Sequence, residues 1–217
     1  MIRTPFWKST ALALLVLAWT VVPAAAQEVE GTAKDARFAS PDLPTPNVYR
    51  TGAGRPGPEY WQQRVDYDIR ATLDPATATV SGSETITYHN HSPDTLRFLW
   101  LQLDQNLFAP GSQGAQTFPQ EGRFGGAEAG GGYSISRVEG AGQALETRID
   151  GTLMRVDLAQ PLAPHDTTTF SIDWSFVVPE TGADRMGHDG DHYLLAQWNP
   201  RLAVYDDVHG WNTMPYL

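Results

Sequence analysis

The sequence predicts an all-β domain of antiparallel strands. Several segments alternate apolar and polar residues with the two-residue period of a half-buried strand. Turn-forming Gly, Pro, Asn and Asp residues separate these segments, and no segment has the apolar period of an amphipathic helix. Short strands with frequent turns between them are typical of an antiparallel sandwich or a curved sheet.

The first three strands are expected within the first half of the chain. Segment 64–74 alternates apolar and polar residues and ends at the turn dipeptide Asp74-Pro75. Segment 77–90 alternates in the same way, and another turn follows it. Segment 95–104 is apolar at consecutive positions, which predicts a central strand that is covered on both faces.

A second set of strands follows a glycine-rich stretch between Gly111 and Gly132, which holds eight glycines in 22 residues. This stretch lacks the Gly-Lys pair of a phosphate-binding P-loop, so we expect a surface loop. Beyond it, β-branched and aromatic residues recur at every second position. The strands of this set are expected at residues 133–138, 144–151, 152–158 and 167–178.

Residues 1–26 have the features of a signal peptide. Arg3 and Lys8 form a positive leader, an apolar run extends from Ala11 to Val22, and small residues precede a cleavage position before Gln27. The apolar run is shorter than the ~20 residues of a membrane-spanning helix, and the chain has no cysteine for a lipid anchor. We therefore expect an exported protein, periplasmic or extracellular, with no membrane anchor after cleavage.

Residues 27–58 are expected to form an arm or linker, because five prolines and four glycines interrupt any apolar pattern. Residues 59–217 would then be the β domain. After cleavage the chain has 13 basic residues (15 minus 2) and 25 acidic residues, a formal charge of −12. Such acidity argues against nucleic acid as a partner. Without cysteines, packing rather than disulfides must stabilise the exported domain.

The stretch His188-Asp189-Gly190-Asp191-His192 is the one place where the spacing of residues suggests a metal site. Two histidines four apart bind zinc when a helix places them on one face. Glycine is unfavourable in a helix interior by about 1 kcal/mol relative to alanine, and strand-like residues follow at once. We interpret the stretch as a solvated loop and predict no metal site in this chain, although ion binding by His188 and His192 stays open.

The last part of the chain is dense in aromatic residues: Tyr193, Trp198, Tyr205, Trp211 and Tyr216. They suit an ordinary core strand followed by an aromatic-rich turn. Alternatively, exposed tryptophans on a β-sandwich would stack on sugar rings, so the chain could be a free-standing exported binding module for glycans or a protein partner. The sequence stops at Leu217 directly after this apolar-aromatic run, which we expect of a fragment.

Three blocks of the sequence resemble one family: "PGPEYWQQRVDYDIRATLD", "SGSETITYHNHSPDTLRFLWLQLDQNLFAPGS" and "LLAQWNPRLAVYDDVHGWNTMPY". Together they are similar to the N-terminal region of secreted bacterial zinc aminopeptidases of the aminopeptidase N type, the gluzincin metallopeptidases. The resemblance implies a saddle-shaped, non-catalytic β domain. That domain would pack against a separate catalytic domain and cap the active-site cleft while N-terminal residues are removed from peptides.

The family's zinc motif, His-Glu-x-x-His, is absent, because none of the six histidines is followed by glutamate. The resemblance therefore places zinc and all catalytic residues in a catalytic domain beyond this chain, which should be inactive alone. It also implies that Gln197 and Asn199 contact the free α-amino group of the substrate, where the family has Gln-x-Glu or Gln-x-Gln. A plain alternative is that Asn199 satisfies a strand end before Pro200.

Overall fold

The computed structural model describes residues 45–117, 131–180 and 186–216. The predicted signal peptide and most of the predicted arm lie outside these residues, as does much of the glycine-rich stretch. The described chain is nearly all β, and its sheets are antiparallel, as predicted. Within the described residues, no helix has the length and apolar character needed to cross a membrane.

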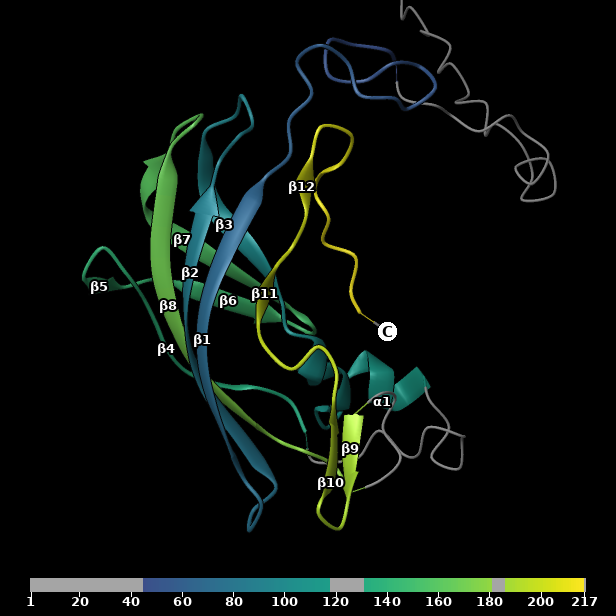
Figure 1. The fold of residues 1–217 in the computed structure, drawn as a ribbon, viewed down its shortest axis with the longest axis vertical. Coiled ribbons are helices and arrows are strands. Elements are labelled where there is room, and N and C mark those ends of the chain that lie inside the picture. The colour runs from purple at the N-terminus through teal and green to yellow at the C-terminus, as the bar shows by residue number, and fades with distance from the viewer. Residues whose placement is uncertain (1–44, 118–130, 181–185, 217) are drawn as a thin grey trace, which may run out of the picture. The chain divides into compact units, whose positions relative to one another are not determined.

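Two sheets contain most of the strands (Figure 1). The five-stranded sheet has the order β1-β2-β8-β4-β5 and the four-stranded sheet has the order β11-β3-β7-β6. Strands β9 and β10 form one separate hairpin, and β12 and β13 form another. The bounds are β1 Arg64–Asp74, β2 Thr79–His89, β3 Leu96–Gln102, β4 Ser134–Gly140, β5 Gln143–Ala144, β6 Thr147–Asp150, β7 Leu153–Leu162, β8 Thr167–Val177, β9 Met186–Asp189, β10 His192–Leu195, β11 Arg201–Leu202, β12 Tyr205–Asp206 and β13 Gly210–Trp211.

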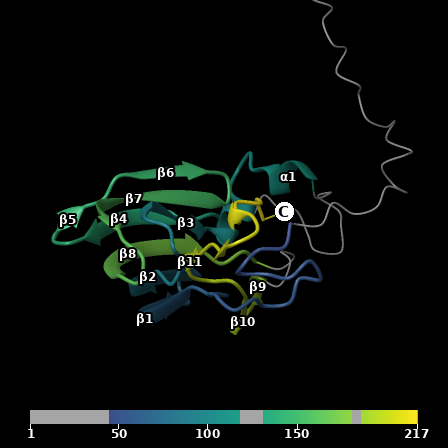
Figure 2. The same ribbon diagram turned by 90° about the horizontal axis from the view of Figure 1, so that it is seen from above.

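The two sheets pack face to face in layers, with β6 and β7 on one side and β8, β2 and β1 on the other (Figure 2). The core lies between them because alternate residues of each strand point inward. On β2 and β8 the cross-strand pair Ile86 and Phe170 belongs to this core. Gly82 lies on the same face beneath the indole of Trp174, where an added Cβ would collide with the ring.

Strand β3 corrects one prediction. Leu99 and Leu101 are fully buried, but Phe98 and Trp100 on the opposite face are only half-buried. The guanidinium of Arg155 lies 4.0 Å from the centre of the Phe98 ring on this outer face. β3 is a central strand between β11 and β7, as predicted, but the prediction that both of its faces are covered was wrong, because Phe98 and Trp100 stay partly exposed.

Two short helical elements connect the sheets, which the strand pattern did not predict. A 3₁₀ helix, η1, spans Asp104–Phe108, and a short helix, α1, spans Gln113–Thr117 at the start of the glycine-rich stretch. The segment predicted as one strand at 144–151 is divided between β5 and β6.

Before β1, the Arg50 guanidinium donates two hydrogen bonds to the Asp207 carboxylate, at 2.9 and 2.6 Å, and so ties part of the predicted arm to the domain.

Candidate functional site

The two histidines of the suspected metal motif lie on opposite faces of a hairpin. His188 pairs with Tyr193 across β9 and β10, and Asp189 pairs with His192, so Gly190 lies in the turn with φ +56°. Neighbouring residues of a strand point to opposite faces, so His188 and His192 cannot converge on one ion. The motif forms a β-hairpin rather than the predicted solvated loop. No group of three or more potential metal ligands occurs among the residues that the structure describes.

Residues 197–201, here called the 197–201 segment, are held by side chains from η1, from β2 and from the loops at Tyr133 and Tyr216. Gln197 has a positive φ of +50°, which is uncommon for a residue other than glycine. Its backbone carbonyl accepts a hydrogen bond from Gln105 Nε2 at 3.1 Å and lies 3.5 Å from Tyr133 Oη. Its side-chain Oε1 accepts a hydrogen bond from Tyr216 Oη at 3.2 Å. These contacts fix a backbone turn that Gln197 would not adopt readily by itself.

Asn199 points its amide nitrogen into the domain. Nδ2 donates to the Glu84 carboxyl at 3.3 Å and to the backbone carbonyl of Pro200 at 3.0 Å. Asn199 is half-buried, and its Oδ1 accepts no hydrogen bond from any described residue. The structure thus leaves one side-chain acceptor of the 197–201 segment available to a donor from outside.

Glu84 is the main electrostatic feature beneath this segment. It is fully buried on β2, between Ile69 of β1 and Ile172 of β8. Its Oε1 has no hydrogen-bond partner among the described residues. Burial raises the pKa of Glu84 to about 8, and the hydrogen bond from Asn199 only partly opposes this rise. The carboxyl is therefore mainly neutral at pH 7.

A second buried acid lies at the other end of the segment. Asp104, at the start of η1, is 1% exposed and accepts a hydrogen bond from Arg201 Nε at 2.8 Å. The next residue, Leu202, donates its backbone N–H to Tyr67 Oη at 2.9 Å. Burial raises the pKa of Tyr67 and of Tyr133. Glu84, Asp104, Arg201, Tyr67 and Tyr133 are here called the polar cluster. Buried acids therefore bond to the middle of the 197–201 segment, at Asn199, and to its last residue, Arg201.

Of these residues, only Gln197 and Asn199 were singled out from the sequence. Glu84, Asp104, Gln105 and Tyr133 were missed because each lies far along the chain from the segment. For Glu84 there was a local signal: it occupies the inward position in the alternation of 80–88, where the other inward residues are apolar or glycine. An acidic residue among apolar residues on the inward face of a strand indicates that the acid either bonds to a partner within the fold or has a function.

The aromatic residues of the last part of the chain pack inward. Trp198 is half-buried, with its ring centre 5.8 Å from that of Trp174, and Trp211 packs against Tyr205 at 5.0 Å and Tyr88 at 6.2 Å. Neither tryptophan forms the exposed stacking platform that the glycan-binding alternative needs. The pattern agrees with the other interpretation, an aromatic-rich turn beside the core.

The adjacent acids Asp206, the last residue of β12, and Asp207, in the turn that follows, bond to different partners. Asp207 pairs with Arg50, which holds the pKa of Asp207 below its usual value. Asp206 instead accepts backbone hydrogen bonds from Val208 and His209, at 2.9 and 2.7 Å. The two carboxylates therefore cannot act together on one substrate.

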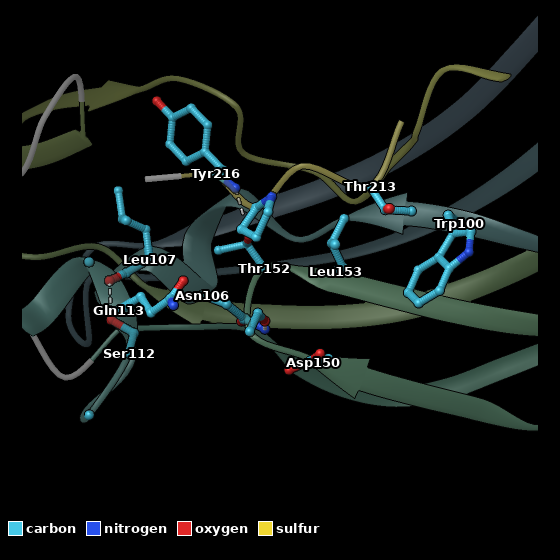
Figure 3. A pocket seen from close by; sticks show the side chains of 14 residues that line it. Trp100, Asn106, Leu107, Ser112, Gln113, Asp150, Thr152, Leu153, Thr213 and Tyr216 are labelled. Carbon is cyan, nitrogen blue, oxygen red and sulfur yellow. Dashed lines mark hydrogen bonds between the residues drawn. The ribbon is translucent and has the colours of Figure 1, made fainter. Parts of the chain in front are cut away.

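A pocket of about 530 Å³ lies beside the 197–201 segment (Figure 3). Tyr216 connects the two, since it bonds to Gln197 and also donates its backbone N–H to Thr152 Oγ1 at 2.8 Å. Trp100 closes the other end of the pocket. Asp150 is the only charged residue among the described residues that line it. Such a lining suits neutral or cationic groups better than anions.

No family model matches this sequence, and no curated protein matches it either. Among solved structures, the fold is similar to M1 zinc metallopeptidases. One is the M1 zinc metallopeptidase from Deinococcus radiodurans, with 18% identity and a TM-score of 0.37 over 57% of this chain and 22% of that one. A mutant of that enzyme bound to a Tyr-Ser-Ala substrate has 16% identity and a TM-score of 0.38 over 64% and 31%. A two-domain M1 zinc metallopeptidase mutant bound to L-tryptophan has 15% identity and a TM-score of 0.37 over 61% and 29%. The chain spans less than a third of each of these proteins.

Proposed function

We propose that this chain is the N-terminal, non-catalytic β domain of an exported zinc metallopeptidase of the aminopeptidase type. In the intact protein it would cap the active-site cleft while N-terminal residues are removed from peptides. Its partners would be the protein's own catalytic domain and the peptide substrate. The three sequence blocks that resemble the family support this proposal, as does the all-β fold.

The observation that carries the proposal is the geometry of the 197–201 segment. The amide oxygen of Asn199 accepts no hydrogen bond from the described residues, while its nitrogen donates to Glu84 and to the Pro200 carbonyl. A peptide's α-ammonium group has three N–H donors and needs acceptors in a fixed position. The anchors on Gln197 and Arg201 hold the backbone on either side of Asn199, so the oxygen would be presented in one orientation.

Zinc would be bound elsewhere in the intact protein. The described residues contain no cluster of histidines and acids that fits a zinc ion, and the two hairpin histidines point apart. In metallopeptidases a bound zinc ion activates the attacking water. This chain would contribute substrate orientation and restriction of the cleft, and none of its residues is assigned a catalytic role.

The first experiment is to sequence the source DNA beyond the codon for Leu217. An open frame that encodes His-Glu-x-x-His and a later glutamate is expected, and the full product should then release p-nitroaniline from leucine p-nitroanilide in a zinc-dependent reaction. In that product, Asn199→Ala should raise KM with a smaller effect on kcat. A stop codon directly after Leu217, or a full product without aminopeptidase activity, would overturn the proposal.

The matched control in the full product is Asn212→Ala. Asn212 is exposed in the same part of the chain, and among the described residues its side chain accepts a hydrogen bond from the backbone of Met214 alone, at 3.3 Å. This control should keep the KM of the unmodified protein. An equal rise in KM in both variants would show that Asn199 has no special role in amine recognition.

A further inference from the structure

Glu84 has a role in the core that packing does not explain. An apolar residue at this inward position would pack between Ile69 and Ile172 without any cost of burying a polar group. Instead, the chain places a fully buried carboxyl there, whose hydrogen-bond partner among the described residues is Asn199. Buried carboxyls without compensation are rare in folded proteins. The residue is therefore best explained by what it does to Asn199.

No described residue offers a cation to Glu84. Arg201 acts electrostatically on Tyr67 and Tyr133, but its guanidinium bonds to Asp104. An ionised carboxylate in a core needs a positive partner or several hydrogen bonds, and Glu84 has only the amide of Asn199. A cationic ligand would supply the positive charge that the described residues do not give to Glu84.

We propose that Glu84 is a positioning residue for a cationic ligand at Asn199: it orients the amide and supplies negative charge when an ammonium group binds. Asn199 Nδ2 donates to the carboxyl, so Oδ1 lies on the other branch of the amide and is directed away from Glu84. When an ammonium group donates to Oδ1, the neutral carboxyl releases its proton to solvent. The carboxylate then strengthens the N–H donation of Asn199 and increases the negative charge on Oδ1.

The choice of an ammonium group as ligand rests on the proposed function, whereas the coupling between Glu84 and Asn199 does not. The coupling follows from burial, from the 3.3 Å hydrogen bond and from the unpaired Oε1. It also explains how a neutral asparagine would serve where an acid is expected for amine recognition. The negative charge would lie one hydrogen bond further inside the domain.

Other titratable groups of the cluster should keep their charge between pH 6 and pH 9. Tyr67 of β1 and Tyr133 both have a pKa raised by burial, so they stay neutral in this range. Arg201 of β11 and Asp104 of η1 form an ion pair with each other. A change in the NMR signals of the Asn199 side-chain amide between pH 6 and pH 9 should therefore report the ionisation of Glu84.

The first test follows the side-chain amide of Asn199 by ¹H–¹⁵N NMR in the chain as it stands. Between pH 6 and pH 9 its resonances should shift with a midpoint near the Glu84 pKa of about 8. Glu84→Gln keeps an acceptor for Asn199 but cannot ionise, so the shift should vanish. The exposed control Glu146→Gln should titrate like the unmodified protein. An Asn199 signal that does not move in the unmodified protein would overturn the inference without any variant having to fold.

The second test measures the binding of isobutylammonium, which stays charged over this range because the pKa of a primary alkylammonium is about 10.4. Binding should tighten by at least roughly tenfold from pH 6 to pH 9 in the unmodified protein and stay constant in Glu84→Gln. Calorimetry in buffers with different ionisation enthalpies should detect proton release on binding near pH 7. Binding that is insensitive to pH would overturn the inference and leave the proposed function intact. Complete absence of binding would count against the proposed function, and the NMR titration would then decide the coupling by itself.

Discussion

Asn199 donates a hydrogen bond to the buried carboxyl of Glu84 across 3.3 Å, although 115 positions separate the two residues in the chain. The bond joins a strand of the five-stranded sheet to the 197–201 segment. Because Glu84 is fully buried and has one unpaired oxygen, its protonation influences both the stability of the domain and the state of the segment. The predictions below begin with this pair.

The unfolding free energy should fall as pH rises from about 4.5 towards 8. In the unfolded chain Glu84 ionises near its ordinary pKa of 4.5, whereas in the folded domain its pKa is about 8. The folded state thus holds a proton that the unfolded state has lost, and stability decreases through this window. In Glu84→Gln the fall in unfolding free energy between these pH values should be smaller by several kcal/mol, because residue 84 can no longer ionise. Each unit of difference between the folded and unfolded pKa is worth about 1.4 kcal/mol.

Urea unfolding at pH 5 and pH 8 measures the effect. The difference between the unmodified protein and Glu84→Gln isolates Glu84 from other titrating groups, and Glu146→Gln serves as the exposed control. If Glu84→Gln and the unmodified protein lose stability equally between the two pH values, Glu84 is not the buried acid that titrates.

Removal of Arg201 should be costly because it leaves Asp104 buried without its cation. The side chain of Asp104 is 1% exposed and that of Arg201 is 40% exposed. Breaking a buried pair from one side typically costs about 3 kcal/mol or more, so Arg201→Ala should lower the unfolding free energy by about that amount. Asp104→Asn in the same chain should recover part of the loss. The exposed pair of Arg64 and Asp66 is the contrast, and Arg64→Ala should cost less than about 1 kcal/mol.

Gly82→Ala should destabilise the domain by about 1–3 kcal/mol, because the new methyl group would collide with the Trp174 indole inside the core. The tryptophan emission spectrum should shift as the ring moves. Ser81→Ala, on the outer face of the same strand, should leave both stability and emission nearly unchanged. A neutral Gly82→Ala would mean that the sheet face near Trp174 has free space.

Asp207→Ala should free the segment before β1 from the domain. The side chain of Asp207 is 3% exposed and accepts two hydrogen bonds from the Arg50 guanidinium, although the two residues are 157 positions apart in the chain. Without this anchor, trypsin should cleave after Arg50 several-fold faster, because proteases attack segments that open locally. Asp68→Ala, an exposed change on β1, is the control. Equal cleavage rates would show that other contacts hold the segment.

Much of the fold was predictable because strand formation leaves a local mark. Alternation over 64–74, 77–90 and 167–178 corresponds to β1, β2 and β8, and the turn residues between such segments were recognisable. The outer face of β3 was misjudged because Phe98 and Trp100 look like core residues in sequence. Their partial exposure depends on whether a second layer covers that face, which no local pattern reveals.

For the candidate site, the sequence by itself indicated only Gln197 and Asn199, and it did so through a resemblance and not through chemistry visible in their neighbours; their role in binding stays a prediction. It also carried a local sign at Glu84, an acid at an inward position of a strand. Tertiary structure decided the rest: that Glu84 meets Asn199, that Asp104 meets Arg201, and that His188 and His192 point apart. The physical reason is that side-chain alternation is set within a few residues, whereas the partner of a buried polar group is set by sheet packing between distant segments.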